Sequence, residues 1–183
     1  MSFDPADPIG SVFAPVLGKP GWNVRAGYGS AFMLEFGEPH LEVREPAAST
    51  SDSEKVQRLL AKRHVTVLGE WSLLIEFCGW QVLQNEIPVA TSDAEPPNIK
   101  AIVDTLDGQC LTSVSGDGAC GTSRFAFDLG GVIETARFDD ELLGDWFLLT
   151  PEEMCLTYRG DGTYSWGRDT LTDDEHVWVP LPR

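Results

Sequence analysis

The 183 residues are enough for one domain with a sizeable core, and 42% apolar content with six Trp excludes a disordered chain. The net charge of −16 is uneven, because residues 91–183 carry 18 acids and six bases whereas residues 1–90 carry 11 acids and seven bases. This charge argues against nucleic-acid and membrane partners. Either it keeps a small protein soluble, or it attracts a basic protein partner. The chain begins without a signal-peptide pattern and has no membrane-length apolar run, which predicts a cytoplasmic protein.

Short apolar or alternating runs bounded by Gly, Pro and Asp dominate the chain and predict strands. Asp161-Gly162 predicts a two-residue hairpin turn, and the closing segment 177–180 is expected to dock as an edge piece. The expected strands are 32–36, 41–44, 65–68, 71–77, 111–115, 124–129, 132–136, 146–149, 155–159 and 163–166.

Two helices interrupt this pattern. A capping box at 51–54 precedes an apolar stripe that runs to about Arg63, and Pro96-Pro97 opens a second helix over 98–106. The second segment has an alternative, since Asp107-Gly108 could instead turn a hairpin. Together the elements predict an α+β fold that is mainly β, with antiparallel strands in a sandwich or partly open barrel and one or two helices.

The two halves of the chain resemble each other. Residues 32–37 (FMLEFG) correspond to 125–130 (FAFDLG), and Gly69–Ile75 corresponds to Gly144–Thr150. We therefore expect one domain, 1–183, built from two homologous antiparallel strand units over about 17–90 and 106–167 with a linker at 91–97. Trp71 and Trp146 would then hold equivalent packed positions.

Residue patterns that could carry chemistry have structural explanations. The G-x-G-x-x-G run at 116–121 precedes a strand rather than a helix, so it is expected to be a hairpin loop. The four Cys have no C-x-x-C spacing and are expected to be small buried residues; for Cys120 no His shares a local motif. The three His lack metal-ligand spacing. The sequence therefore predicts no cofactor, no metal site and no catalytic residue.

Carboxylates recur at equivalent places in the two units. Glu35 and Glu42 in the first unit correspond to Asp128 and Glu134 in the second. Their recurrence indicates a structural duty, such as accepting hydrogen bonds at a turn, whereas acid–base catalysis would require one carboxyl group of a pair to be buried and perturbed.

The segments 144–151 (GDWFLLTP) and 156–165 (LTYRGDGTYS), with 29–39 (GSAFMLEFGEP), resemble small bacterial proteins of uncharacterised families. Such strand repeats are also similar to those of immunity proteins that neutralise secreted toxins. The resemblance implies stoichiometric binding and no catalytic residue. Four Lys against nine Arg, with abundant Gly, is typical of a GC-rich bacterial genome.

We favour binding over turnover and expect an acidic, immunity-like module for a basic protein, without a cofactor. The acids of the second half would steer the partner and contact it at the rim, and nearby Trp side chains would anchor it. The expected partner-binding residues are Asp139, Asp140, Glu141, Asp145, Glu152, Glu153, Trp166 and Trp178.

Two other functions fit the sequence. One is a small-molecule-binding protein or hydrolase that uses Glu35, Asp128 or His40 in a barrel-like pocket. The other is a structural homo-oligomer built through exposed strand edges. One helix also carries a basic face. Its bases complement the helix dipole and offset the acidic body, and the functional alternative is a docking patch for an acidic partner or for the protein's own second half. That face comprises Lys55, Arg58, Lys62 and Arg63.

Overall fold

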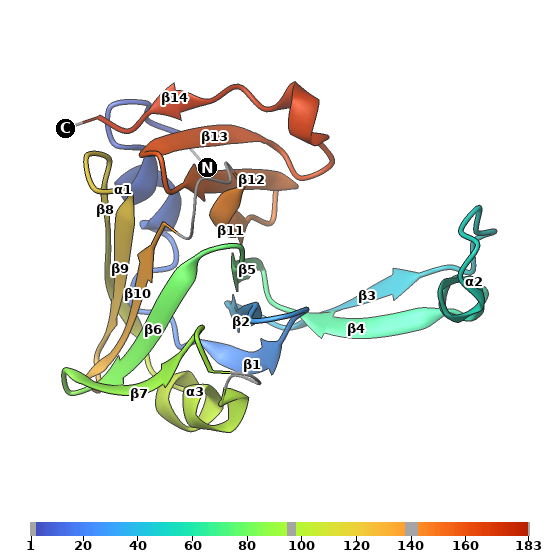
Figure 1. Cartoon of the computed structure of the whole chain (residues 1–183), viewed down its shortest axis with the longest axis horizontal. Helices are drawn as coiled ribbons and strands as arrows, with labels where there is room; N and C mark the ends of the chain where they lie inside the picture. The colour runs from blue at the N-terminus through green and yellow to red at the C-terminus, as the bar shows by residue number, and fades with distance from the viewer. Residues whose placement is uncertain (1–2, 95–97, 138–142, 183) are drawn as a thin grey trace.

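The computed structural model describes residues 3–94, 98–137 and 143–182, and in these residues the chain is mainly β-strand (Figure 1). The helical elements in this part of the chain are short. They are α1 (Pro8–Phe13), α2 (Glu54–Leu60), α3 (Ile99–Leu106) and the 3₁₀ turn η1 (Asp173–Glu175).

One large sheet has seven antiparallel strands in the order β1-β2-β5-β11-β12-β13-β14. Its central strands show the period-two burial of a sheet with one face on a core, most clearly in β5. The strands are β1 (Trp22–Ala26), β2 (Phe32–Phe36), β5 (Trp71–Ile75), β11 (Gly144–Leu149), β12 (Met154–Arg159), β13 (Thr163–Arg168) and β14 (Val179–Pro180).

A second sheet has five antiparallel strands in the order β7-β6-β10-β9-β8. Strand β9 alternates strictly between half-buried and buried positions, so one face of this sheet also points into the core. The strands are β6 (Gly79–Gln84), β7 (Ile87–Thr91), β8 (Leu111–Asp117), β9 (Thr122–Phe127) and β10 (Gly131–Ala136).

The two large sheets face each other across one hydrophobic core. Phe125 of the five-stranded sheet meets Trp146 of the seven-stranded sheet edge-to-face, with ring centroids 5.5 Å apart. Phe32 and Trp80 make a second contact between the sheets, at 5.0 Å. Neither sheet closes on itself, so the predicted mainly β, α+β fold is confirmed as an open antiparallel sandwich.

Helices α1 and α3 contribute to the same core. Asp7 caps α1 by accepting a hydrogen bond from the Gly10 N–H, and the helix inserts Phe13 between Phe125 and Trp146. Asn98 caps α3 in the same way, and its Ile102 and Leu106 are fully buried. The predicted helix over 98–106 is therefore confirmed, and the alternative hairpin does not form.

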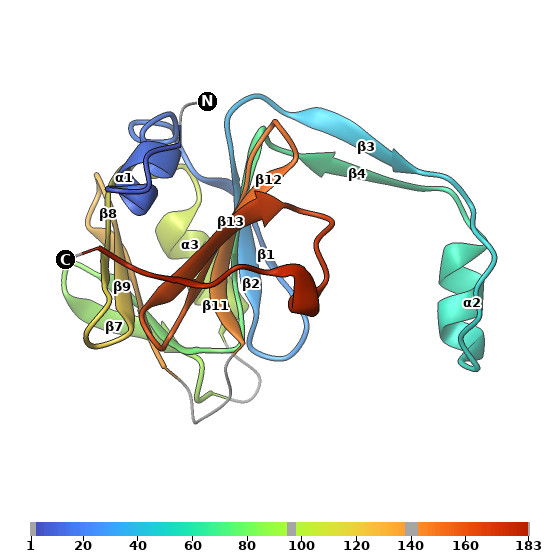
Figure 2. The ribbon, with the colours of Figure 1, turned by 90° about the horizontal axis from the view of Figure 1, so that it is seen from above.

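A third, two-stranded sheet pairs β3 (His40–Arg44) with β4 (His64–Leu68) and lies apart from the sandwich (Figures 1 and 2). The two strands extend away from the sandwich and carry α2 at their far end. We refer to residues 38–68 as the arm and to the rest of the chain as the body. None of the residues of α2 is buried, so its apolar stripe does not face the core as the sequence suggested.

Most predicted strands are confirmed within a few residues, as is the docking of the closing segment as β14 on β13. A hairpin turn does form at Asp161-Gly162, but it has three residues, 160–162, rather than the predicted two, because Arg159 pairs with Thr163. Helix α1 and strands β1, β6 and β7 were not predicted, and Thr91, expected in the linker, belongs to β7. The capping box predicted at 51–54 is wrong, because the N-cap of α2 is Ser53 rather than Ser51, and Ser53 makes no side-chain capping bond.

The segments that match in the two halves lie in different surroundings. The first matching pair is split between the sheets, with β2 in the seven-stranded sheet and β9 in the five-stranded sheet. The second pair, β5 and β11, are antiparallel neighbours in one sheet, and both Trp71 and Trp146 are buried. The two repeat units stay a prediction.

Candidate functional site

Exposed carboxylates gather at the open end of the β12–β13 hairpin, the end away from its tight turn. The Asp169 N–H donates to the Glu153 carbonyl at 3.1 Å, which brings the acids of the two flanking segments together. Arg168 pairs with Glu153 at 3.2 Å on the exposed surface, and such a pair contributes little stability. The exposed acids of this region, which we call the acidic end, are Glu152, Glu153, Asp169, Asp174 and Glu175.

The acidic end includes two of the predicted partner-binding residues, Glu152 and Glu153. Three others, Asp139, Asp140 and Glu141, lie outside the described residues. Glu175 forms a capping box with Thr172, whose N–H and hydroxyl both donate to its carboxylate at 2.9 Å. These hydrogen bonds, the backbone one foremost, lower the pKa of Glu175 and keep it charged.

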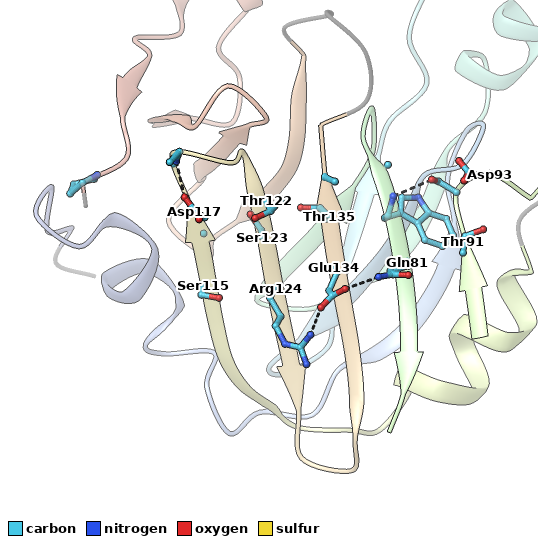
Figure 3. Close-up of a pocket in the computed structure, with 18 residues that line it drawn as sticks. Gln81, Thr91, Asp93, Ser115, Asp117, Thr122, Ser123, Arg124, Glu134 and Thr135 are labelled. Atoms are coloured by element: carbon cyan, nitrogen blue, oxygen red, sulfur yellow. Dashed lines mark hydrogen bonds and ion pairs between the residues drawn. The ribbon is translucent and has the colours of Figure 1, made fainter. Parts of the chain in front are cut away.

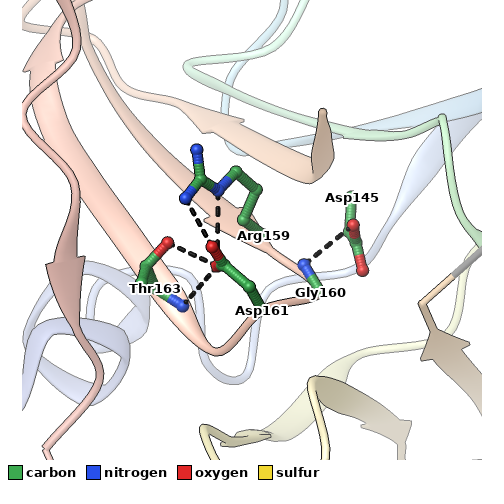
Figure 4. A network of polar contacts seen from close by, with 5 residues as sticks. All are labelled: Asp145, Arg159, Gly160, Asp161 and Thr163. Carbon is green, nitrogen blue, oxygen red and sulfur yellow. Dashed lines mark hydrogen bonds and ion pairs between the residues drawn. The ribbon is translucent and has the colours of Figure 1, made fainter. Parts of the chain in front are cut away.

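Asp145 was expected at a partner-binding rim, yet its side chain is directed inward. The residue is only 3% exposed, and its Oδ1 accepts the Gly160 N–H at 3.0 Å at the turn of the β12–β13 hairpin (Figure 4). In the described part of the chain Oδ2 has no hydrogen-bond donor. Burial raises the pKa of Asp145 to about 7, against the lowering effect of the Gly160 hydrogen bond.

The same turn is held by Arg159, which forms an ion pair with Asp161, and by Thr163, whose N–H donates to Asp161 at 3.0 Å (Figure 4). Arg159 also lies over the Trp178 ring, 4.1 Å from its centroid, and His176 stacks on the same ring. The Arg159-Gly160-Asp161 run is therefore part of a structural turn.

The two predicted anchors, Trp166 and Trp178, are each half-buried. Trp166 stacks on Phe3 with ring centroids 5.0 Å apart, and Trp178 lies beside Arg159 at the turn end of the hairpin. Trp166 is three positions before Asp169 in the chain, so of the two anchors only Trp166 lies towards the acidic end.

A cavity of about 1190 Å³ opens on the five-stranded sheet (Figure 3). A row of polar side chains in register crosses its floor, from β7 to β8. Gln81 donates to Glu134 at 2.7 Å, and Arg124 forms an ion pair with the same carboxylate. The members of this row, which we call the polar ladder, are Thr91, Gln81, Glu134, Arg124 and Ser115.

The carboxylates considered for a catalytic pocket are not brought together. Glu35 is fully buried, pairs with Arg25 at 2.6 Å and accepts the Gly69 N–H at 3.1 Å. Asp128 accepts the Cys110 N–H at 2.8 Å, and His40 lies exposed at the start of the arm. Both acids thus accept hydrogen bonds at turns, which is the structural duty that the sequence indicated.

The cysteines divide into two classes. All four are free; Cys78 and Cys155 are buried as expected, whereas Cys110 and Cys120 are not. The loop that carries Cys120 is the predicted hairpin turn between β8 and β9, and the Asp117 carboxylate raises the pKa of the Cys120 thiol. A thiol held protonated is a poor nucleophile.

Within the described ranges no three His, Cys, Asp or Glu residues are grouped to hold a metal ion.

The chain matches no protein-family model, and neither a curated protein nor a solved structure is similar to it. In the part of the chain that the structure describes, no helix combines the length and apolarity needed to cross a membrane. A function for this protein is therefore inferred from the geometry and charge of the molecule itself.

Sequence reasoning missed the polar ladder and the isolation of the arm. The ladder was hidden because β6 and β7 were not predicted, so Gln81, the partner of Glu134 on one side, and Thr91 beyond it were unknown. For the arm, the alternation at 40–44 and 64–68 was visible in the sequence. Alternation shows that a ribbon has an apolar face, but it does not show what covers that face.

Proposed function

We propose that the protein is a non-catalytic binding module for a basic protein, which its acidic body attracts and holds. The observation that carries this proposal is the segregation of charge between arm and body. Residues 38–68 contain five acids and five bases, so the body carries the whole net charge of −16. A field of one sign over a compact body raises the association rate of an oppositely charged partner by about ten- to a thousandfold.

The acidic end supplies a local contact surface for such a partner. Glu152 and Glu153 extend from the loop before β12, with Asp169 bonded beside them through the backbone. Trp166 lies on β13, three positions before Asp169 in the chain, and is half-buried with Phe3 stacked on its ring, so the exposed part of the indole is the aromatic contact we assign to the partner. Charges at a rim mainly set the association rate and its salt dependence, while a buried aromatic residue contributes more to affinity.

The test compares two double charge reversals of equal size. Glu152→Lys with Glu153→Lys changes the acidic end, and Asp104→Lys with Asp107→Lys makes the same change on α3, which Figure 1 shows at the opposite side of the body. Each protein is used to capture partners from the native lysate at low and moderate salt. We expect one stoichiometric basic protein that the wild type and the α3 variant retain and the acidic-end variant loses.

Two results would contradict the proposal. One is a wild-type eluate that contains only a mixture of basic proteins, all lost at moderate salt, because the charge would then be unspecific. The other is equal loss of the partner from both variants, since only the net charge would then matter and not its place on the body.

The cavity over the polar ladder supports a second candidate function, the binding of a small polyhydroxylated molecule. The two charged members of the ladder compensate each other, because Arg124 forms an ion pair with Glu134. The remaining hydroxyl groups of Thr91 and Ser115 suit a neutral ligand rich in hydroxyls. Saturation-transfer NMR with a panel of monosaccharides tests this candidate, and signals that Gln81→Leu leaves unchanged would contradict it.

A further inference from the structure

The arm exposes a continuous apolar stripe. Its cross-strand partners are Leu41 with Val67 and Val43 with Val65, and directly opposite residues of an antiparallel ribbon share one face. Their exposed fractions are 65%, 45%, 49% and 51%, which is unusual for four adjacent aliphatic side chains. The other face carries polar pairs, a Glu opposite a Thr and an Arg opposite a His.

Nothing in the described body covers this stripe. Strands β3 and β4 pair only with each other in the ranges that the structure describes, and Figures 1 and 2 show both of them pointing away from the sandwich. An isolated two-stranded ribbon is marginally stable in water, and it gains stability when its apolar face packs on another surface. The arm is therefore built to be covered by something other than its own body.

Charge favours a second copy of this chain as the occupant. Two bodies that each carry −16 repel each other, whereas two arms with five acids and five bases each do not. The arm is thus the part of the molecule through which two copies can approach. A stripe of aliphatic side chains is also self-complementary, as the single patch of a two-fold interface must be.

The tip of the arm adds an attractive contact to this arrangement. The segment between β3 and β4, residues 45–63, contains three acids and four bases and carries a net charge of +1. Arg58 pairs with Glu54 and Arg63 with Glu45, and the other two bases of this tip are Lys55 and Lys62. When two arms lie antiparallel about a two-fold axis, the tip of each arm points towards the body of the other copy. The basic tip then meets an acidic body, and the opposite charges hold the antiparallel direction.

From these observations we infer that the protein forms a two-fold dimer in which the arms of two copies pack stripe to stripe, each with its basic tip against the other body. The inference is independent of the basic partner proposed above, because that partner contacts the acidic end of the body and not the arm.

Sedimentation velocity of the purified full chain tests the inference with two matched variants. Val65→Lys places a charge in the stripe, and Thr66→Lys places the same charge at the next position, on the opposite face and across from Glu42. We expect a wild-type dimer at high micromolar concentration. Val65→Lys should weaken dimerisation at least tenfold, whereas Thr66→Lys should leave it unchanged.

A third variant tests the tip. Lys62→Glu should weaken the dimer at low salt and should lose its effect at high salt, since the contact is electrostatic. Because the arm lies outside the core, thermal unfolding of the body should be the same in all three variants. Leu41→Ser replaces Val65→Lys if that variant fails this check.

Three outcomes would overturn the inference: a wild type that stays monomeric at all concentrations, a dimer that Val65→Lys does not weaken, or equal weakening by the two Lys variants. A dimer that Lys62→Glu leaves unchanged at low salt would overturn the contact between tip and body. None of these results affects the capture experiment at the acidic end, so the two proposals fail separately.

Discussion

Replacing Asp145 with Asn removes a carboxyl group that is buried, where its charged form is disfavoured. Burial raises the pKa of Asp145 from the ordinary 3.8 to about 7, although the Gly160 N–H donates to the carboxylate and lowers it. The folded protein therefore binds this proton more tightly than the unfolded chain does. As a result, the free energy of unfolding falls as the pH rises from about 4 to about 7.

The size of the effect follows from the two pKa values. A difference of about three units corresponds to about 4 kcal/mol over the whole range, of which about 2.5 kcal/mol falls between pH 5 and pH 8. Asn keeps an oxygen that accepts the Gly160 N–H but carries no charge at any pH. Asp145→Asn should thus gain stability relative to the wild type by about 2.5 kcal/mol from pH 5 to pH 8.

Urea denaturation followed by Trp fluorescence at pH 5, 6, 7 and 8 measures this difference, and Trp146 next to the substituted residue is a built-in reporter. Taking the difference between variant and wild type removes the titration of all other groups. The control is Asp52→Asn, the same substitution at an exposed position. A difference between Asp145→Asn and the wild type that is constant from pH 5 to pH 8 would refute the reasoning.

Two further predictions concern the packing of the sandwich. Gly121 has a φ of +66°, and a methyl group there would overlap the Gly160 carbonyl oxygen, so Gly121→Ala should cost more than about 2 kcal/mol. Gly18→Ala, with a φ of +80° but open space, should cost only about 1 kcal/mol. Ser123→Ala removes the acceptor of the buried Trp146 indole N–H, which lies 2.9 Å away, and should cost about 1 to 3 kcal/mol in chemical denaturation.

Each of these two predictions has an outcome that contradicts it. Equal costs for Gly121→Ala and Gly18→Ala would show that the turn of β12–β13 does not pack against the β8–β9 loop. For the buried hydrogen bond the control is Ser115→Ala on the exposed outer face of the same sheet. A Ser123→Ala variant as stable as Ser115→Ala would show that the Trp146 indole is satisfied in another way.

Much of the fold follows from local sequence. The alternation of Trp71, Leu73 and Ile75 predicts a strand with one buried face, and the structure buries these three residues. Asp161-Gly162 predicts a tight turn because Gly accepts a positive φ, and Gly162 has a φ of +79°. These predictions succeed because their physical cause lies within a few residues of chain.

The candidate site was less predictable from the same sequence. Glu152 and Glu153 are exposed, as a polar loop after a strand suggests, whereas Asp145, a charged residue at the start of the strand β11, is buried. Its burial depends on the turn at Gly160, which comes from a separate stretch of chain. Glu35 is buried for a related reason, since its partners Arg25 and Gly69 come from two other segments.

The sequence by itself determined the antiparallel strands, the main turns and the overall acidity, because propensity, alternation and charge are local or additive properties. Only the tertiary structure decided which faces are covered. Leu41 and Val65 read like any strand residues facing a core, yet they lie on an arm that leaves the body. Burial depends on which distant segments pack together, and a local pattern contains no record of that.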